Sequence, residues 1–201
     1  RDAPAKTSST NGATNANKNR SKQKPIVLLV TDSNGRGLNL RQLKPEAFVI
    51  REDRYTAKEA TENIPKIDDP TSVTEIVFNI GLNDFCVKGH SAGRIQEDVL
   101  QMQFAYKDHF PNARHHITSL PPLANSHIKI NRCLQQLCSF TQSNFVSTKV
   151  FCDRASGKLR SGLMRDHIHY NDHGTRILAK ELKKSLYSLA NIGNNQLQQM
   201  R

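Results

Sequence analysis

Four residues of this 201-residue chain have side chains suited to acyl transfer: Ser33, Asn83, Asp166 and His169. A serine hydroxyl is a weak nucleophile, so it needs an imidazole to accept its proton. A carboxylate that holds the imidazole in one tautomer stabilises the imidazolium, and preorganised donors stabilise the developing oxyanion. The four residues can supply all of these groups if the fold brings them together.

Ser33 lies just after a continuous apolar run at residues 26–30 that leads into Thr31. Such a run is typical of a strand that is buried on both faces in a parallel sheet. It ends at Asp32, Ser33, Asn34 and Gly35, which favour turns and helix starts. Because open α/β folds bind ligands at the carboxyl edge of the sheet, Ser33 is a candidate nucleophile. The alternative is that Asp32 and Ser33 only cap the next helix.

Further strands are predicted at 47–50, 75–80, 115–118 and 148–151, and helices at 38–43, 56–64, 91–110, 127–143 and 171–189. The alternation predicts a three-layer α/β/α sandwich of the flavodoxin-like type, with a central parallel sheet of about five strands. Thr56 is expected to cap its helix, with Glu59 at the capping-box position. Of His115 and His116, on the fourth strand, we expect one to be buried and the other exposed.

Two further turns carry polar groups to the same predicted edge. Gly81-Leu82-Asn83-Asp84 follows the third strand and can aim the Asn83 amide at it. The stretch from Asp166 to Gly174 lies just before the last helix and supplies a carboxylate and imidazoles.

Three segments in this order resemble conserved blocks of the SGNH, or GDSL, hydrolases: Thr31-Asp32-Ser33-Asn34, Gly81-Leu82-Asn83-Asp84 and Asp166-x-x-His169-x-Asn171-x-x-Gly174. The resemblance covers residues 25–189, which we expect to form one hydrolase-like domain. It implies an esterase with Ser33 as nucleophile, His169 as general base and Asp166 as the orienting carboxylate. It further implies an oxyanion hole made by the Ser33 N–H and the Asn83 side chain, with no metal and no cofactor.

Three residues beside this set are candidates for substrate contacts: Arg36, Gly81 and Asp84. Arg36 could attract an anionic substrate or simply be solvated, and Asp84 could instead hydrogen-bond the Asn83 loop. His167, His169 and His173, with Asp166 and Asp172, are an alternative metal site, which the lack of matching ligand pairs disfavours.

The chain departs from the family pattern at two places. The glycine that precedes Asp-Ser in the family is Thr31 here, and residues 51–65 lack the glycine whose N–H completes the family's oxyanion hole. Tyr55 or Thr56 stands about where that glycine should be. Losing one such donor can cost on the order of a hundredfold in rate, so slow turnover is expected.

The turn Asp-Ser-Asn-Gly-Arg-Gly and the basic stretch before it resemble the esterase domain in first-open-reading-frame proteins of non-LTR (LINE-type) retrotransposons. This resemblance implies short-chain acyl or acetyl esters as substrates, and contact with lipid. It also implies a longer parent protein with coiled-coil and nucleic-acid-binding segments, through which self-association is possible. The chain starts at Arg1, not at Met, which fits a fragment or a processed product.

The net charge of +11 is unevenly distributed, because residues 1–24 contain six Lys or Arg against one Asp. This segment has almost no large apolar side chains, so we expect a disordered basic linker. It could contact RNA or an anionic membrane surface, or remain a solvated linker. Residues 190–201 are expected to fray.

No apolar run is long enough to predict a transmembrane segment. The four cysteines show no CxxC pair, which favours free thiols and a cytoplasmic or nuclear protein that is at most peripheral to membranes. Two other functions stay open: a catalytically weak module of the same fold that binds anionic lipid or RNA through its basic surface, and an inert scaffold.

Overall fold

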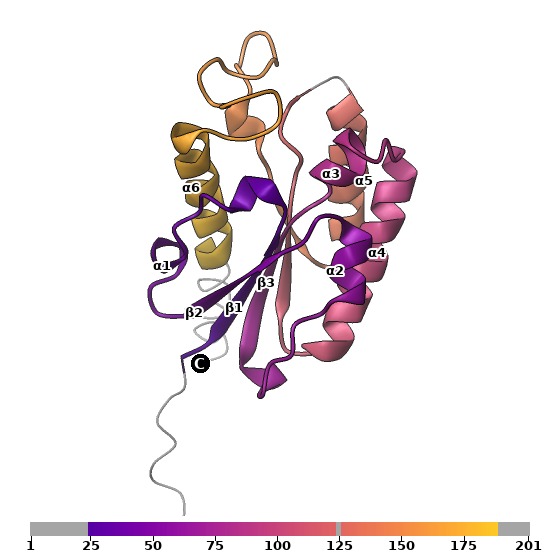
Figure 1. The fold of residues 1–201 in the computed structure, drawn as a ribbon, viewed down its shortest axis with the longest axis vertical. Helices are drawn as coiled ribbons and strands as arrows, with labels where there is room; N and C mark the ends of the chain where they lie inside the picture. The colour runs from indigo at the N-terminus through magenta and orange to yellow at the C-terminus, as the bar shows by residue number, and fades with distance from the viewer. Residues whose placement is uncertain (1–23, 124–125, 189–201) are drawn as a thin grey trace, which may run out of the picture.

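Five parallel strands form a single sheet in the order β2-β1-β3-β4-β5 (Figure 1). The structure is a computed structural model that describes residues 24–123 and 126–188. The strands are β1 (Ile26–Thr31), β2 (Phe48–Asp53), β3 (Val73–Asn79), β4 (Arg114–Thr118) and β5 (Asn144–Val146). The predicted five-stranded parallel sheet is confirmed.

Helices cover both faces of this sheet, which makes three layers (Figure 1). One face carries α1 (Leu40–Leu43) and α6 (Asp172–Ser188), and the other carries α2 (Ala57–Glu62), α4 (Ala92–His109) and α5 (Ser126–Thr141). The short helix α3 (Leu82–Cys86) starts beyond the carboxyl end of β3, and 3₁₀ turns lie at Ser33–Gly35, Pro70–Ser72 and Lys149–Phe151. Thr56 caps α2 as predicted, because its side chain accepts a hydrogen bond from the Glu59 N–H.

The alternation of side chains along β1 divides the core into two clusters. Leu28 and Val30 pack into the cluster under α2, α4 and α5, whereas Val27 and Leu29 pack into the cluster under α6. Every residue of β1 is buried. The continuous apolar run of the sequence therefore corresponds to a central strand with a helix layer on each face.

The predicted position of the fifth strand is wrong. The strand is Asn144–Val146, and the segment 148–151, predicted as strand, holds a 3₁₀ turn. The Ser119 hydroxyl accepts the Thr148 N–H at 2.7 Å, and the Thr148 hydroxyl donates to the Leu120 carbonyl at 3.0 Å. These bonds turn the chain away from the sheet, and Phe151 enters the core against the Tyr170 ring.

The prediction that one of His115 and His116 is exposed is also wrong, because both are buried. Strand β4 is an interior strand with helices on both faces, so alternate residues point into different layers of the core. His115 packs edge-on against Phe78 on one face, and His116 contacts Ser185 of α6 on the other.

The carboxyl ends of β1 and β3 lie side by side, which brings the first two motif turns to one edge of the sheet. The Asp32 N–H donates to the Asn79 carbonyl at 3.1 Å, and the Asn79 amide donates to the Thr31 hydroxyl at 2.9 Å. Thr31, where the family has glycine, thus ties the two strand ends together.

No described helix is both long and apolar enough to cross a bilayer. All four cysteines are free thiols, as predicted. The tails expected to be disordered or frayed lie, except for Lys24, outside the described residues.

Candidate active site

Ser33, His169 and Asp166 are joined by two consecutive hydrogen bonds. Ser33 Oγ lies 2.9 Å from His169 Nε2, and His169 Nδ1 lies 2.8 Å from Asp166 Oδ2. Both lengths are those of ordinary side-chain hydrogen bonds. Both ring nitrogens of His169 are therefore engaged, which removes it from the alternative metal site; His167 and His173 are exposed.

The Asp166 carboxylate organises its own turn. Its Oδ1 accepts the backbone N–H groups of Ile168 at 2.8 Å and His169 at 2.7 Å. These two bonds and the His169 side chain hold the pKa of Asp166 well below its usual range. Asp166 therefore stays anionic, which its 45% exposed side chain also favours, and the imidazole keeps its orienting partner.

Asn34 connects the two segments that carry the serine and the histidine. Its side-chain oxygen accepts the Tyr170 N–H at 3.0 Å, and its amide donates to the Ile168 carbonyl at 3.2 Å. His169 is thus held on both sides by the residue that follows Ser33. Asn34 is part of the first sequence motif, but the sequence alone did not predict this bridging role.

The last two residues of the third motif, Asn171 and Gly174, have structural roles. The Asn171 side chain accepts the Gly174 N–H at 3.0 Å and donates to the Gly162 carbonyl at 2.8 Å. A Cβ on Gly174 would collide with the Leu163 carbonyl oxygen. Asn171 and Gly174 therefore anchor the start of α6 against the preceding loop.

Asp32 is a buried acid beside the candidate nucleophile. Burial raises its pKa to about 6, although the backbone N–H groups of Asn34 and Leu82 act in the opposite direction. The Asn34 N–H donates to Asp32 Oδ1 at 3.0 Å, so this carboxyl shapes the Ser33 turn.

Asn83 lies in α3 at the same edge, and its amide donates to the Tyr55 carbonyl at 3.0 Å. That bond uses one of the two amide protons and fixes the orientation of the side chain. Gly81, just before the helix, has φ 110°, a left-handed conformation that favours glycine. The type of residue at position 81 is therefore explained by the backbone.

Tyr55 and Thr56 stand where the resembled family has its oxyanion glycine, and one of their two backbone N–H groups is already hydrogen-bonded. The Tyr55 N–H donates to Glu59 Oε2 at 2.9 Å, so it is not free for a substrate. The Thr56 N–H has no hydrogen bond among the residues that the structure describes. Of the two residues at this position, Thr56 is the better candidate for a third oxyanion donor, beside the Ser33 N–H and the Asn83 amide.

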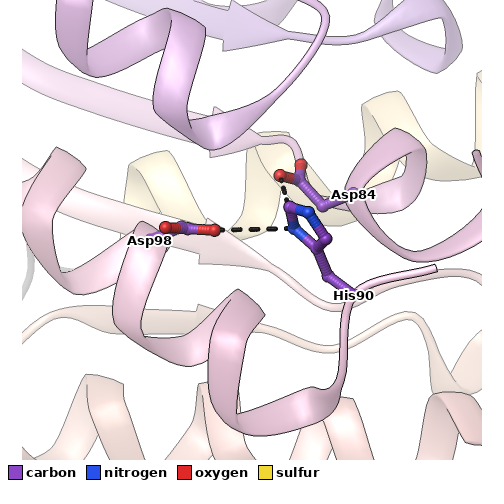
Figure 2. A group of neighbouring side chains, drawn as sticks. All are labelled: Asp84, His90 and Asp98. Atoms are coloured by element: carbon purple, nitrogen blue, oxygen red, sulfur yellow. Dashed lines mark ion pairs between the residues drawn. The ribbon is translucent and has the colours of Figure 1, made fainter. Parts of the chain in front are cut away.

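Arg36 and Asp84, the other two candidates for substrate contacts, occupy different environments. Arg36 is exposed, and its carbonyl accepts Arg51 Nη1 at 2.8 Å. Asp84 is fully buried and accepts the N–H of Ala57, the first residue of α2, at 3.2 Å. Burial raises the pKa of Asp84. Its other oxygen faces His90, beside Asp98 (Figure 2).

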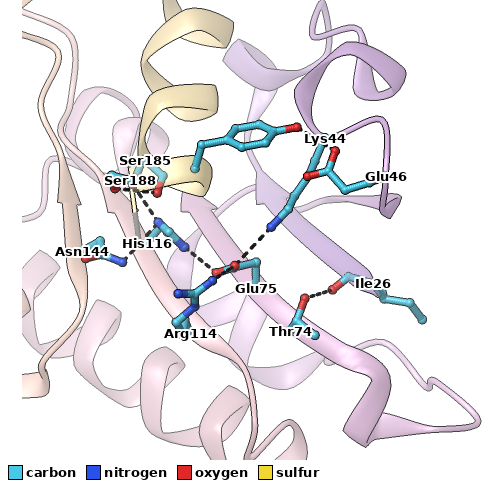
Figure 3. Close-up of polar contacts among 11 residues, drawn as sticks. Ile26, Lys44, Glu46, Thr74, Glu75, Arg114, His116, Asn144, Ser185 and Ser188 are labelled. Atoms are coloured by element: carbon cyan, nitrogen blue, oxygen red, sulfur yellow. Dashed lines mark hydrogen bonds and ion pairs between the residues drawn. The ribbon is translucent and has the colours of Figure 1, made fainter. Parts of the chain in front are cut away.

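A buried ionic network that sequence reasoning missed surrounds Glu75 of β3 (Figure 3). Glu75 accepts from His116 Nε2 at 2.8 Å and from Arg114, and Lys44 Nζ lies 3.4 Å away. His116 Nδ1 lies 2.8 Å from Ser185 Oγ. Burial acts to raise the pKa of Glu75, but His116 and Arg114 outweigh it and hold this pKa below its ordinary value.

The series Ser185, His116 and Glu75 is similar in residue types to the candidate triad, but it is structural in character. His116 and Glu75 are each only 1% exposed, and Glu75 is already neutralised by two cations. No sequence motif links these residues, since they come from β3, β4 and α6.

No protein-family model matches the chain, and no curated protein matches it. Solved structures do resemble it. One is a protein from Streptococcus pneumonia provisionally described as a platelet activating factor, with TM-score 0.71 and 21% identity over 84% of this chain and 86% of that chain.

Two other similar structures are an esterase and a lipase-like protein. The psychrotrophic esterase EstA from Pseudoalteromonas sp., solved with monoethylphosphonate as inhibitor, has TM-score 0.62 and 17% identity over 83% of this chain and 98% of that chain. A GDSL-like lipase from Bacteroides thetaiotaomicron has TM-score 0.64 and 13% identity over 83% and 89%. The chain therefore has the α/β fold of the GDSL hydrolases, with a five-stranded parallel sheet covered by helices on both faces.

Proposed function

We propose that this protein is a serine esterase that hydrolyses short-chain acyl or acetyl esters. The observation that carries the proposal is the series Ser33 Oγ, His169 Nε2, His169 Nδ1, Asp166 Oδ2, joined at 2.9 and 2.8 Å. Its three residues come from two turns 136 residues apart in the sequence, at one edge of the sheet. The esterases and lipases among the similar structures support the same reaction class.

The reaction follows from the roles that these groups can take. His169 Nε2 removes the Ser33 hydroxyl proton as Ser33 Oγ attacks the ester carbonyl, and Asp166 stabilises the imidazolium. The tetrahedral intermediate collapses, the imidazolium protonates the departing alcohol, and an acyl-serine remains. Water, deprotonated by the same imidazole, then attacks the acyl-serine and releases the carboxylic acid and free Ser33.

The oxyanion would be bound by the Ser33 N–H and the second amide proton of Asn83. The bond from Asn83 to the Tyr55 carbonyl preorganises that amide, which supports this role. Because the Tyr55 N–H donates to Glu59, a third hydrogen bond to the oxyanion would have to come from the Thr56 N–H. We therefore expect slow turnover and activated, short-chain esters as the best substrates.

Turnover of p-nitrophenyl acetate, butyrate and octanoate by wild type and Ser33→Ala tests the proposal. We expect Ser33→Ala to lose roughly 10³-fold or more in kcat. Ser139→Ala, which removes an exposed helical hydroxyl, is the matched control and should leave turnover unchanged. A p-nitrophenyl phosphonate should label Ser33 alone, as located by peptide mass spectrometry. Equal turnover by wild type and Ser33→Ala would reject the esterase assignment.

The engaged Tyr55 N–H favours one second candidate, a catalytically weak module that binds anionic lipid or RNA through its basic surface. The assignment to a retrotransposon protein, and contacts made by residues 1–24, rest on the sequence resemblance and the charge alone. Binding to anionic vesicles or RNA that weakens steeply with salt, together with serine-independent turnover, would favour this candidate.

A further inference from the structure

A second group of chemically suited side chains lies behind the candidate oxyanion residue. Asp84 Oδ1 lies 3.8 Å from His90 Nδ1, and Asp98 Oδ2 lies 3.6 Å from the same nitrogen (Figure 2). One potential ligand atom from each residue can be chosen so that all three lie within 4.8 Å of one another. The residues come from α3, the turn after it, and α4.

Two of the three facing atoms lack a hydrogen-bond partner. Asp84 Oδ1 and His90 Nδ1 are both buried and make no hydrogen bond in the described part of the chain, and Asp84 as a whole is fully buried. A buried carboxylate oxygen without a donor is costly, because it loses its water and gains nothing in return. The unpartnered oxygen and nitrogen point at one another across a gap too long for a hydrogen bond.

We propose that Asp84, His90 and Asp98 bind a divalent transition-metal cation, with Zn²⁺ as the best fit. Three protein ligands from imidazole and carboxylate groups, with a fourth position left to water, are a common zinc arrangement. Ligands about 2.0–2.1 Å from a tetrahedral zinc lie about 3.3–3.4 Å apart, so the two separations through His90 need to shorten by only a few tenths of an ångström.

The surroundings suit a cation. His90 is 33% exposed, which leaves a path from solvent to its ring. The remaining oxygen of Asp84 is held by the Ala57 N–H, and Asp98 is held by Arg94 at 2.9 and 3.0 Å. Such outer partners orient carboxylate ligands toward a metal. Arg94 also pairs with Glu97 at 3.8 Å, and Asp84 Oδ1 and His90 Nδ1 make no hydrogen bond in the described part of the chain, so both stay available to the cation.

The consequence for the protein is a cross-link among α2, α3 and α4. Asp84 follows Asn83 in α3 and touches the first residue of α2, so the cation would hold the segment that carries the amide of Asn83. The inference concerns cation binding and does not rest on the proposed esterase activity.

Titration of the purified chain with Zn²⁺ by calorimetry, and with Co²⁺ by absorption spectroscopy, tests the site. We expect one Zn²⁺ per chain and a raised Tm, since a cation that binds the folded state stabilises it. Co²⁺ should give d–d bands without a thiolate charge-transfer band, which separates this site from Cys86 and the other thiols. His90→Ala should weaken binding at least tenfold, and His109→Ala, at an exposed histidine, should not.

Three outcomes would overturn the inference: no Zn²⁺ binding by the folded wild type, equal binding by wild type and His90→Ala, or a thiolate band in the Co²⁺ spectrum. Asp98→Asn, checked for folding by circular dichroism, is a second variant that should also lose the metal.

Discussion

Replacing Asn34 with alanine tests how the two catalytic turns are held together. The change removes both hydrogen bonds between the Ser33 turn and the backbone on either side of His169. Loss of the bond to the Ile168 carbonyl costs about 0.5–1.5 kcal/mol net, and leaving the buried Tyr170 N–H without an acceptor costs roughly 1–3 kcal/mol. We expect Asn34→Ala to lower the free energy of unfolding by about 1.5–4.5 kcal/mol.

The same change should affect catalysis, since Asn34 positions His169 without touching the substrate. A misplacement of about 1 Å can cost roughly a hundredfold in rate, so we expect kcat to fall tenfold or more with KM little changed. Urea unfolding gives the stability, and p-nitrophenyl acetate kinetics give kcat and KM. Asn39→Ala, at an exposed asparagine with no capping bond, is the matched control.

A fall in stability without a fall in kcat would show that the His169 turn is held by other contacts. No change in either quantity would mean that the two bonds of Asn34 contribute nothing. Either result would refute the reasoning.

Two predictions concern buried carboxyl groups. Each is tested by measuring the free energy of unfolding of the variant and the wild type in urea between pH 3.5 and 7. Burial raises the pKa of Asp32 from 3.8 to about 6. The folded state is therefore favoured at low pH, and it loses about 3 kcal/mol of stability as the pH rises from 3.8 to about 6. Asp32→Asn should therefore gain that amount relative to wild type between pH 3.5 and 7, and parallel curves would contradict this. Glu75→Gln should lose roughly 1.5–3 kcal/mol near pH 7, because it removes the buried anion with which the Lys44 and Arg114 side chains pair, whereas Glu62→Gln in an exposed pair should lose little. Since the pKa of Glu75 is lowered, the deficit of Glu75→Gln should shrink as pH falls below about 4.5; a deficit independent of pH would show that charge is not its cause.

Local patterns predicted most of the fold. The apolar run of β1, the helical spacing in α4 and the Thr56 cap of α2 are properties of neighbouring residues, so they can be read from short windows. The capping box is only half formed, because the Glu59 carboxylate accepts the Tyr55 N–H and not the Thr56 N–H. The fifth strand was misplaced because Phe151 is apolar for a reason that a short window does not contain, namely that it packs on Tyr170. The burial of both His115 and His116 likewise follows from the interior place of β4 in the sheet.

The sequence by itself determined the α/β class, the order of the strands along the chain, and the choice of Ser33, Asn83, Asp166 and His169 as candidates. Only the tertiary structure decided that Asn34 bridges to Ile168 and Tyr170, that the Tyr55 N–H is taken by Glu59, and that Asp84 meets His90 and Asp98. Glu75, His116 and Ser185 also meet only in the folded chain. The physical reason is that strand and helix signals are short-ranged, whereas a hydrogen bond needs two groups within about 3 Å, and that proximity is created by packing between distant segments.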